Sequence, residues 1–381
     1  MRWQGPLAEL HSLRLAAWTG ARALARRGID PAALDFGVLG FTVPQKGSFY
    51  GLPWLAAELG APHLPGPTIM QACATSARCL QVAATEIAGG GATAALVVAC
   101  DRVSNGPHLY YPSPGGLGGS GDAEDWVLDN FASDPWAGCA MVQTAENVAA
   151  KWGISREAQD DLVLMRLAQY HAAVAAGFHA GFIERDIPDR RFGAAFTTLD
   201  GDIGVQPVNA EKVRGLKPVQ PGGTVTFAAQ THPADGNAGA IVATREAARR
   251  LSGRPEIEIA IRGFGTARVE KTMMPAAPVP AAARALAMAG VAIGDIDAVT
   301  SHNPFAVNDI VFAHETGFAL ERMNINGCSL VFGHPQGPTG LRCTIELIET
   351  LVARGGGLGL FQGCAAGDTA MAMVVEVRDA G

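Results

Sequence analysis

The sequence predicts an α/β fold made of two similar halves. Helix-like stretches alternate along the chain with short runs rich in Val, Ile, Leu and Ala, which is typical of a central sheet covered by helices. A weak internal repeat places the same succession of helix, glycine and strand near each end of the 381-residue chain. Duplication of one α/β unit explains both observations.

The elements expected in the first hundred residues follow in a regular order. The first helix stops at Gly28, and a later helix ends in a run of three glycines at 89–91, as helices often do. The short apolar runs between them are the expected strands. The predicted order is helix, strand, strand, helix and strand, over residues 15–28, 34–40, 67–72, 75–91 and 94–100.

The repeat pairs one helix and one strand from each half. The motif Arg-Ala-Leu-Ala at 22–25, with a glycine three residues behind it, recurs 262 residues later at 284–287, again with its glycine. The strand start Leu-Asp at 34–35 recurs at the same separation as Ile-Asp at 296–297. Chance identity in alanine-rich helices is the alternative. The spacing is kept across a helix end and a strand start, which favours duplication.

A stretch with a different sequence pattern separates the two halves. A glycine-rich loop at 113–122 is followed by helical segments over 144–177 and by the basic, loop-like VRGLKPVQPGGTVT at 213–226. Ser155, with Gln159 four residues later, marks the expected start of one of these helices. We predict an N-terminal half over residues 1–105 and 233–254, an inserted loop domain over 106–232, and a C-terminal half over 255–381.

Composition and charge exclude several classes of protein. With 48% hydrophobic and 17% charged residues, the chain has enough apolar material for packed cores. The net charge of −7 argues against nucleic-acid binding through a basic face. No stretch approaches the roughly 18 consecutive apolar residues of a membrane helix, and the N-terminus lacks a secretory pattern. We therefore expect a cytoplasmic protein that binds neither membrane nor nucleic acid.

Seven cysteines are scattered through the chain. None forms a Cys-x-x-Cys pair or a Cys/His cluster with the spacing of a zinc site, and an odd, scattered set argues against a disulfide framework. We therefore expect no metal site. Individual cysteines become candidate nucleophiles instead.

Cys73 has the most suggestive position of the seven. It follows an apolar strand directly and opens a helix whose expected buried stripe is Ala77, Leu80, Ala84 and Ile87. A thiol at a helix N-terminus feels the positive end of the helix dipole, which lowers the pKa of the thiol and favours the nucleophilic thiolate. The alternative is a small hydrophobic residue that fills a corner between strand and helix.

Three further candidates lie in the C-terminal part of the chain. His334 lies in the Gly/Pro-rich turn GHPQGPTG, ahead of a helix expected over 344–357. Cys364 lies at the end of a strand, and His302 with Asn303 follows the strand IDAVTS, where α/β sheets carry their ligands. A cysteine nucleophile needs a nearby base, and a second cysteine can move a proton if its pKa is tuned. Two cysteines and two histidines in such places predict covalent catalysis.

Four ordered segments resemble the thiolases, the acyl-CoA C-acetyltransferases of the thiolase superfamily. They are CATSARCLQVAATEIAGGG (73–91), TAENVAAKWGISREAQDDL (144–162), NINGCSLVFGHPQGPTGLR (324–342) and CAAGDTAMA (364–372). The resemblance runs from about Leu7 to the C-terminus. It implies a five-layered α-β-α-β-α sandwich of two βαβαβαββ halves, with an inserted loop domain over the coenzyme A site.

The resemblance implies a role for each candidate residue. Cys73 would take the acyl group as a thioester, His334 would activate Cys73, and Cys364 would move a proton on the second acyl-CoA. His334 with His302 would stabilise the enolate, and backbone N–H groups at Cys73 and around Ala366 would stabilise the tetrahedral intermediate. The implied activity is reversible thiolytic cleavage or Claisen condensation of a 3-ketoacyl-CoA in lipid metabolism. Coenzyme A is then a co-substrate, and no cofactor is tightly bound.

The chain departs from the usual motifs around His302. Where most thiolases have Asn-Glu-Ala-Phe, this chain has His302-Asn303-Pro304-Phe305, which is similar to the sterol-carrier-type branch. An imidazole there could donate directly to the enolate oxygen. The turn after Cys364 reads Ala365-Ala366-Gly367-Asp368, which adds bulk and a carboxylate to a segment that is usually glycine-rich.

The implied coenzyme A and acyl sites are altered as well. Ala229-Gln230-Thr231-His232 replaces the usual Asn-Ala-Ser-Gly, and the residues assign no role to His232. Pro275 replaces a usual glycine, so we expect a substrate other than plain acetoacetyl-CoA. The resemblance assigns the pantetheine arm of coenzyme A to Leu216, Phe227 and Thr231, and the acyl pocket to Met141, Met274 and Phe305.

The resemblance also implies an assembly. Thiolases form tight dimers and often pairs of dimers, so we expect a homodimer, with a homotetramer as its extension. The 113–136 segment stands where the family has an assembly arm, with Trp126, Phe131 and Trp136 as anchors unless they pack on their own domain.

Two other functions stay open. One is a thiolase-like aldolase or condensing enzyme that works with a small partner protein. The other is a non-catalytic acyl-CoA-binding homologue. Retention of both Cys73 and Cys364 counts against the first, and the full set of two cysteines and two histidines counts against the second.

Overall fold

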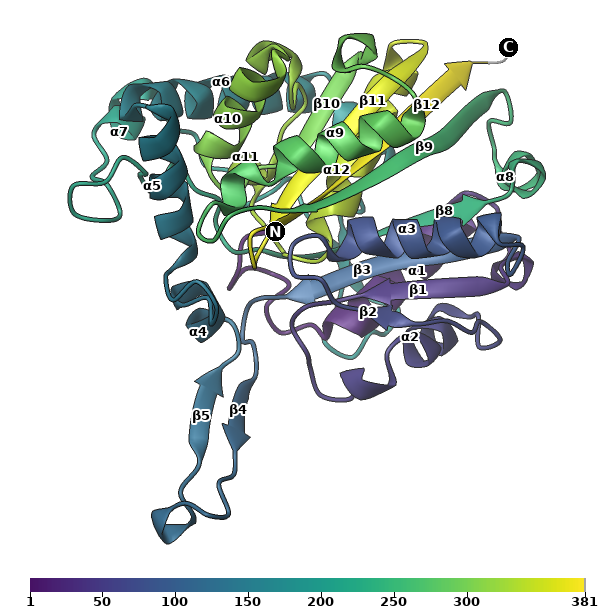
Figure 1. Cartoon of the computed structure of the whole chain (residues 1–381). Helices are drawn as coiled ribbons and strands as arrows, with labels where there is room; N and C mark the ends of the chain where they lie inside the picture. The colour runs from purple at the N-terminus through teal and green to yellow at the C-terminus, as the bar shows by residue number, and fades with distance from the viewer. Residues whose placement is uncertain (380–381) are drawn as a thin grey trace.

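Two four-stranded sheets frame the molecule in the computed structural model, which describes residues 1–379 (Figure 1). In the first sheet, of order β2-β1-β3-β8, the first three strands are parallel and β8 is antiparallel to β3. In the second, of order β10-β11-β12-β9, only β10 and β11 are parallel neighbours. The strands are β1 (Phe36–Gly40), β2 (Thr68–Ile69), β3 (Ala94–Arg102), β8 (Asp235–Ala243), β9 (Ile257–Arg268), β10 (Ala298–His302), β11 (Gly356–Ala365) and β12 (Thr369–Asp379).

Burial on both faces explains the apolar sequences of the inner strands. Ala95 and Val97 of β3 belong to the core between the two sheets, whereas Leu96 and Val98 belong to a core on the outer face. Strand β12 alternates in the same way between the central core and an outer core. Strands covered on both faces read as nearly continuous apolar runs, which is what the sequence shows.

Helices fill three layers around the two sheets. In the central layer, α3 (Thr75–Ala88) and α12 (Thr339–Ala353) pack on each other and on both sheets. The outer layers are α1 (Ser12–Arg26), α2 (Leu52–Leu59) and α8 (Arg245–Leu251) on the first sheet, and α9 (Pro278–Ala289) and α10 (Ala306–Thr316) on the second. The predicted five-layered sandwich is confirmed. Within residues 1–379, none of the helices is both long and apolar enough to span a membrane.

The internal repeat has a structural counterpart in each half. Strands β1 and β10 occupy its two copies, 262 residues apart. The aspartate before each strand makes the same contact, because Asp35 accepts a backbone N–H at the start of β3 and Asp297 accepts one in β11, both at 2.9 Å. Gly28 and Gly290 follow α1 and α9 with φ of +65° and +71°, a left-handed conformation that favours glycine.

Several expected boundaries differ, and one of the differences matters for Cys73. The strand predicted over 67–72 is reduced to two residues, because the chain turns at Ala72 with a φ of +45°. The following helix begins at Thr75, so Cys73 lies in the turn before it. The other corrections are Ala83 rather than Ala84 as a buried residue of that helix, Ser12–Arg26 for the helix predicted over 15–28, and Thr339–Ala353 for the helix predicted over 344–357.

The 106–232 segment carries a hairpin, four helices and a small two-stranded sheet. The hairpin, β4 (His108–Tyr111) and β5 (Asp122–Asp125), extends away from the rest of the chain at the lower left of Figure 1. Ser155 Oγ accepts the N–H of Ala158 at 3.2 Å, as expected of a residue that caps a helix start. The remaining elements are α4 (Leu128–Ala132), α5 (Met141–Trp152), α6 (Arg156–Ala175), β6 (Asp186–Pro188), β7 (Phe196–Thr198) and α7 (Ala210–Arg214).

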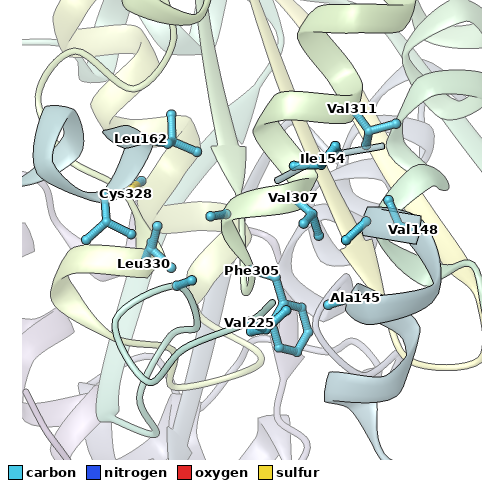
Figure 2. Close-up of a cluster of buried hydrophobic side chains, with 14 of the residues drawn as sticks. Ala145, Val148, Ile154, Leu162, Val225, Phe305, Val307, Val311, Cys328 and Leu330 are labelled. Carbon is cyan, nitrogen blue, oxygen red and sulfur yellow. The ribbon is translucent and has the colours of Figure 1, made fainter. Parts of the chain in front are cut away.

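A separate apolar core joins this segment to the C-terminal half. Side chains of α5 and α6 pack with residues of α10 and of the short helix α11 (Ser329–Phe332), gathered around Phe305 (Figure 2). Two of the expected acyl-pocket residues, Met274 and Phe305, belong to this core, and the third, Met141, packs against it. Cys364 is a member of the same core, so all three lie in one apolar region with it.

Candidate active site

Four reactive side chains converge where the two halves meet. Cys73 comes from the N-terminal half, in the turn between β2 and α3. The other three come from the C-terminal half, since His302 ends β10, His334 lies between α11 and α12, and Cys364 lies near the end of β11. Residues that the sequence places in four separate motifs are thus brought together.

His334 is placed to remove the thiol proton of Cys73. Its Nε2 lies 3.1 Å from Cys73 Sγ, and its Nδ1 lies 2.6 Å from Thr339 Oγ1. When Nδ1–H donates to Thr339, Nε2 carries the lone pair that can accept a proton. The turn is fixed from behind, because the His334 N–H donates to the His232 carbonyl at 2.9 Å. The imidazole is therefore oriented both through its ring and through its backbone.

The thiol of Cys73 is not ionised in advance. Burial raises its pKa to about 11, although the backbone N–H groups of Ala366 and of Cys73 itself lower it. Burial also lowers the pKa of His334 to about 3, so this imidazole is neutral near pH 7. The expectation that the helix dipole lowers the pKa of Cys73 is wrong, because α3 begins only at Thr75 and loss of solvation outweighs the backbone donors. A neutral thiol beside a neutral imidazole suits proton transfer during attack.

The N–H of Ala366 faces the sulfur of Cys73, where it would stabilise negative charge. It lies in the tight turn between β11 and β12, which passes through Gly367 and Asp368 with φ of +79° and +57°. The carboxylate of Asp368 accepts the N–H of Thr272 at 3.0 Å. The extra carboxylate of this turn thus supports the segment before Met274.

Cys364 is buried close to Cys73. It is 1% exposed, and burial, followed by the proximity of Cys73, raises the pKa of its thiol far above the usual range. Asn308 Nδ2 donates to the Cys364 sulfur and to the Pro275 carbonyl, both at 3.3 Å. Sequence reasoning missed Asn308, because an asparagine in the first turn of a helix has no distinctive spacing from the cysteine that it contacts.

His302 stacks on His334. Their ring centroids are 4.0 Å apart and their planes differ by 26°. His302 Nδ1 lies 3.0 Å from Ser329 Oγ, and Nε2 is buried without a hydrogen-bond partner. Burial, followed by the neighbouring His334, lowers the pKa of His302 well below its usual value. The neutral ring can present either an N–H or a lone pair at Nε2, depending on which nitrogen holds the proton.

A buried polar network fixes the strand end that carries His302. The side chain of Asn303 accepts from Ser329 Oγ at 3.1 Å and donates to Asp309 at 2.8 Å. Asp309 pairs with Arg166 of α6 at 2.9 Å, and both side chains are fully buried. The network therefore ties the 106–232 segment to β10. Sequence reasoning missed this pair, because Arg166 and Asp309 are 143 residues apart and share no local pattern.

A second buried carboxylate fixes the turn that carries His334. Asp101, near the end of β3, accepts the N–H groups of Thr42 and Val43 at 2.8 Å, the Thr42 hydroxyl at 2.9 Å and the N–H of Gly337 at 2.8 Å. Burial raises the pKa of Asp101 to about 7, although these donors lower it. Asp101 thus joins the two halves at the reaction centre. An aspartate near the end of the otherwise apolar strand β3 is the sequence signal that could have identified Asp101.

The residues expected to contact coenzyme A lie in different environments. Phe227 is 65% exposed and Leu216 is partly buried. Thr231 Oγ1 donates to the Ser329 carbonyl, so its hydroxyl hydrogen is already engaged. His232 contacts His334 through its carbonyl, and its own ring Nε2 is buried without a partner. Thr231 and His232 therefore border the site through Ser329 and His334.

Two of the three expected assembly anchors pack on their own chain. Trp126 and Phe131 pack against a small core of three valines, and the Trp126 ring N–H donates to the Thr42 carbonyl at 2.8 Å. Trp136 is 65% exposed, and Tyr110 and Leu117 of the hairpin are 61% and 99% exposed. The exposed apolar side chains of this region thus lie on the hairpin, at Leu128 and at Trp136.

Two family models match the chain. The model described as "Thiolase, N-terminal domain" matches residues 1–246, and the one described as "Thiolase, C-terminal domain" matches residues 256–377. The acetyl-CoA acetyltransferase of Escherichia coli is 30% identical over 98% of this chain and 95% of its own. Acetyl-CoA acetyltransferase 2 of Arabidopsis thaliana is also 30% identical, over 98% of this chain and 93% of its own.

Solved structures agree with these matches. Human mitochondrial 3-ketoacyl-CoA thiolase in complex with CoA superposes with a TM-score of 0.89 at 25% identity, covering 98% of this chain and 94% of that one. The Bacillus anthracis acetyl-CoA acetyltransferase superposes with a TM-score of 0.90 at 25% identity, covering 99% of this chain and 95% of that one. The likeness therefore includes both sheets and the segment between them.

Proposed function

Because the chain belongs to the thiolase family, we propose a specific role for each side chain of its reaction centre. The chain is an acyl-CoA acyltransferase of the thiolase type, which cleaves or forms a 3-ketoacyl-CoA through an acyl-cysteine, as the sequence predicts. The observation that carries the residue assignment is the 3.1 Å contact between His334 Nε2 and Cys73 Sγ.

We assign acyl transfer to Cys73 and His334. As the sulfur of Cys73 attacks the substrate carbonyl, its proton moves to His334 Nε2, and Thr339 stabilises the resulting imidazolium through Nδ1. We assign stabilisation of the tetrahedral oxyanion to the N–H groups of Cys73 and Ala366, on the basis of their approach to the sulfur. Collapse of this intermediate leaves the acyl-cysteine, and His334 returns the proton to the departing group.

We assign proton transfer at the α-carbon to Cys364. In condensation, Cys364, once its thiol has lost its proton to solvent, removes a proton from the α-carbon of the second acyl-CoA. The resulting enolate attacks the acyl carbonyl on Cys73, the Cys73 thiolate departs, and the proton held by Cys364 passes to it, which restores both groups. The raised pKa of Cys364 makes its thiolate a strong base, which suits a weakly acidic C–H group. The N–H that Asn308 donates to the sulfur stabilises the thiolate once it forms.

We assign stabilisation of the enolate to His302 together with His334. In this role the Ser329 hydroxyl turns its hydrogen from Asn303 to His302 Nδ1, and the proton of the ring lies on the partnerless Nε2. The motif His302-Asn303-Pro304-Phe305 is the basis for placing the chain in a variant similar to the sterol-carrier-type branch.

We also propose which residues bind the substrate, which segment takes part in assembly and where the domains begin and end. We assign the acyl pocket to Met141, Met274 and Phe305, on the basis of the apolar core that they share with Cys364. Phe227, Leu216 and Thr231 are assigned to the arm of coenzyme A, and the exposed hairpin to assembly beyond a homodimer. The pairing of β8 with β3 supports joining 233–254 to the N-terminal half of 1–105, which leaves 106–232 as the inserted loop domain and 255–381 as the C-terminal half.

A thiolysis assay tests the proposal. The purified chain is supplied with coenzyme A and 3-ketoacyl-CoA esters of increasing length, and the consumption of each ester is followed in the wild type and in Cys73→Ala. We expect consumption that depends on free coenzyme A and is absent from the variant. Turnover that persists in Cys73→Ala would contradict the assigned nucleophile, and binding of the esters without cleavage would favour the partner-dependent alternative.

A further inference from the structure

The reaction centre contains three side chains that can bind one metal ion. Cys73 Sγ and one ring nitrogen each of His302 and His334 lie within 4.8 Å of one another. Thiolate sulfur and imidazole nitrogen are the ligands that Zn²⁺ prefers in proteins. We propose that these three side chains also form a binding site for a borderline-soft divalent cation such as Zn²⁺, which inhibits the protein reversibly.

The separations of the three donor atoms are close to those of a zinc site. With Zn–N bonds of about 2.0–2.1 Å and a Zn–S bond of about 2.3 Å in a tetrahedron, donor atoms stand roughly 3.3–3.6 Å apart. His334 Nε2 and Cys73 Sγ are 3.1 Å apart, and every pair lies within 4.8 Å. The two stacked rings, whose planes differ by 26°, would have to turn apart so that both Nε2 lone pairs point at one ion.

The surroundings of the two imidazoles resemble those of metal-bound histidines. A ligating histidine usually donates its other ring N–H to a hydrogen-bond acceptor, which fixes the ring. His302 Nδ1 lies 3.0 Å from Ser329 Oγ and His334 Nδ1 lies 2.6 Å from Thr339 Oγ1, so each ring can donate to a hydroxyl and present Nε2. Metal binding would select the tautomer of His302 with its proton on Nδ1.

The buried, unpartnered ring nitrogen of His302 is a second observation in favour of a bound cation, independent of the distances between the donor atoms. It is 1% exposed, and its Nε2 has no hydrogen-bond partner, although a buried polar atom without a partner is costly. A bound cation would satisfy this atom. Without His302 only one thiol and one imidazole would remain, so His302 supplies the third ligand.

Binding would block the chemistry at its first step. Zn–S and two Zn–N bonds form, and the thiol proton of Cys73 is released to solvent, so neither the sulfur nor the lone pair of His334 remains available. Cys73 is partly exposed, which gives the cation a path to the site. Three protein ligands leave the fourth position to water. The inference goes beyond the proposed function and does not depend on it, since it rests on the positions of the side chains.

Titration with Co²⁺ tests the site by its spectrum rather than by activity. The chelator-treated, reduced protein is titrated with Co²⁺ while thiolate-to-cobalt charge transfer and the visible bands of a four-coordinate ion are recorded. Zn²⁺ is then added in competition. We expect one Co²⁺ per chain with charge transfer, full displacement by Zn²⁺, and loss of the charge-transfer band in Cys73→Ser.

Two variants and one protection experiment complete the test. In His302→Asn the affinity for Co²⁺ should fall by at least roughly 10–100-fold. Loss of a hydrogen-bond partner of a metal ligand already costs that much, and this variant removes a ligand itself. The matched control Cys139→Ser removes another partly exposed thiol and should leave the titration unchanged. In the unmodified protein, Zn²⁺ should protect Cys73 from alkylation by iodoacetamide, as read by peptide mass mapping, whatever the stability of the variants.

Three results would overturn the proposal. They are a charge-transfer band that survives in Cys73→Ser, an unchanged Co²⁺ affinity in His302→Asn, and alkylation of Cys73 at the same rate with and without Zn²⁺. Because none of these measurements needs turnover, failure of the metal site and failure of the proposed acyl transfer can be told apart.

Discussion

The two halves of the molecule place different residues at equivalent points of one scaffold. Strand β1 ends at Gly40 and β10 ends at His302, 262 residues later. A Cβ atom at Gly40 would lie 2.6 Å from a methyl group of Thr75, so that strand end has no room for a side chain. In the C-terminal half, His302 has a side chain at this point, and its partner on the neighbouring strand β11 is Gly363. A Cβ atom at Gly363 would lie 2.9 Å from His302 Cβ, so the glycine leaves room for the histidine.

The difference shows how a duplicated fold acquires one active site. The N-terminal half supplies the nucleophile Cys73 from the turn before α3, and its buried Asp101 supports the turn of His334. The C-terminal half supplies His334 from the turn before α12, and its strand ends supply His302 and Cys364. The site therefore needs both halves, because the N-terminal half supplies the nucleophile and the C-terminal half supplies the other three reactive side chains.

Removing one cysteine from each half tests the division of roles between the two halves. Cys73→Ser should lower the overall rate by at least about 10³-fold, because no acyl-enzyme forms. Cys364→Ala should leave acylation of Cys73 measurable and should block carbon–carbon bond formation. The two half-reactions are measured separately, by exchange of label between acyl-CoA and coenzyme A and by release of the condensation product. Equal loss of both half-reactions in both variants would contradict the division of roles.

The protonation state of Cys73 is tested by its reaction with iodoacetamide. Because burial raises the pKa of the thiol to about 11, the alkylation rate should rise about tenfold per pH unit between pH 7 and pH 10, or roughly 10³-fold in all. Peptide mass mapping reads Cys73 separately from the other thiols. A rate that is already constant near pH 7 would reveal an ionised thiol and would restore the expectation of a pKa lowered by the helix.

The support of His302 is tested at the buried ion pair. Arg166→Met leaves Asp309 buried without its cationic partner, which should reduce the free energy of unfolding by about 3–5 kcal/mol. Chemical denaturation measures this loss. In a double-mutant cycle with Asp309→Asn, the second substitution should recover part of the stability. A loss below about 1 kcal/mol in the single variant would show that the network does not hold the strand end.

The support of His334 is tested at Asp101. Asparagine can accept only through one atom, so Asp101→Asn would set an amide group against two of the four donors. We expect a loss of about 1.5–3 kcal/mol in the free energy of unfolding, from hydrogen bonds to a charged group. A fall in kcat of up to roughly 10²-fold should accompany it as His334 shifts. Unchanged kcat in a destabilised variant would make Asp101 a purely structural residue.

The smallest expected effect concerns the space beside His302. Gly363→Ala would crowd the His302 side chain and should cost about 1–3 kcal/mol by overpacking. The matched variant Gly40→Ala should cost a similar amount in the other half, where no catalytic side chain stands beside it. Condensation should slow more in Gly363→Ala than in Gly40→Ala when both are assayed at equal folded fraction. Equal rates would remove His302 from the enolate step.

Sequence reasoning reached the fold and the reactive residues because both leave local patterns. Strands such as β3 read as apolar runs, and the four reactive side chains lie in short motifs with recognisable neighbours. What it missed depends on contacts between distant segments. The Arg166–Asp309 pair, the four bonds of Asp101 and the approach of His302 to Cys73 are products of the folded arrangement. The pKa of Cys73 was misjudged for the same reason, since burial is a tertiary property.

The most direct test of the account is intact-mass spectrometry of the protein mixed with acyl-CoA and 3-ketoacyl-CoA esters, followed by peptide mapping. We expect one acyl adduct, on Cys73, that free coenzyme A removes. An adduct on another residue, or none with any ester despite measurable binding, would contradict the claim that Cys73 and His334 form the acyl-transfer pair.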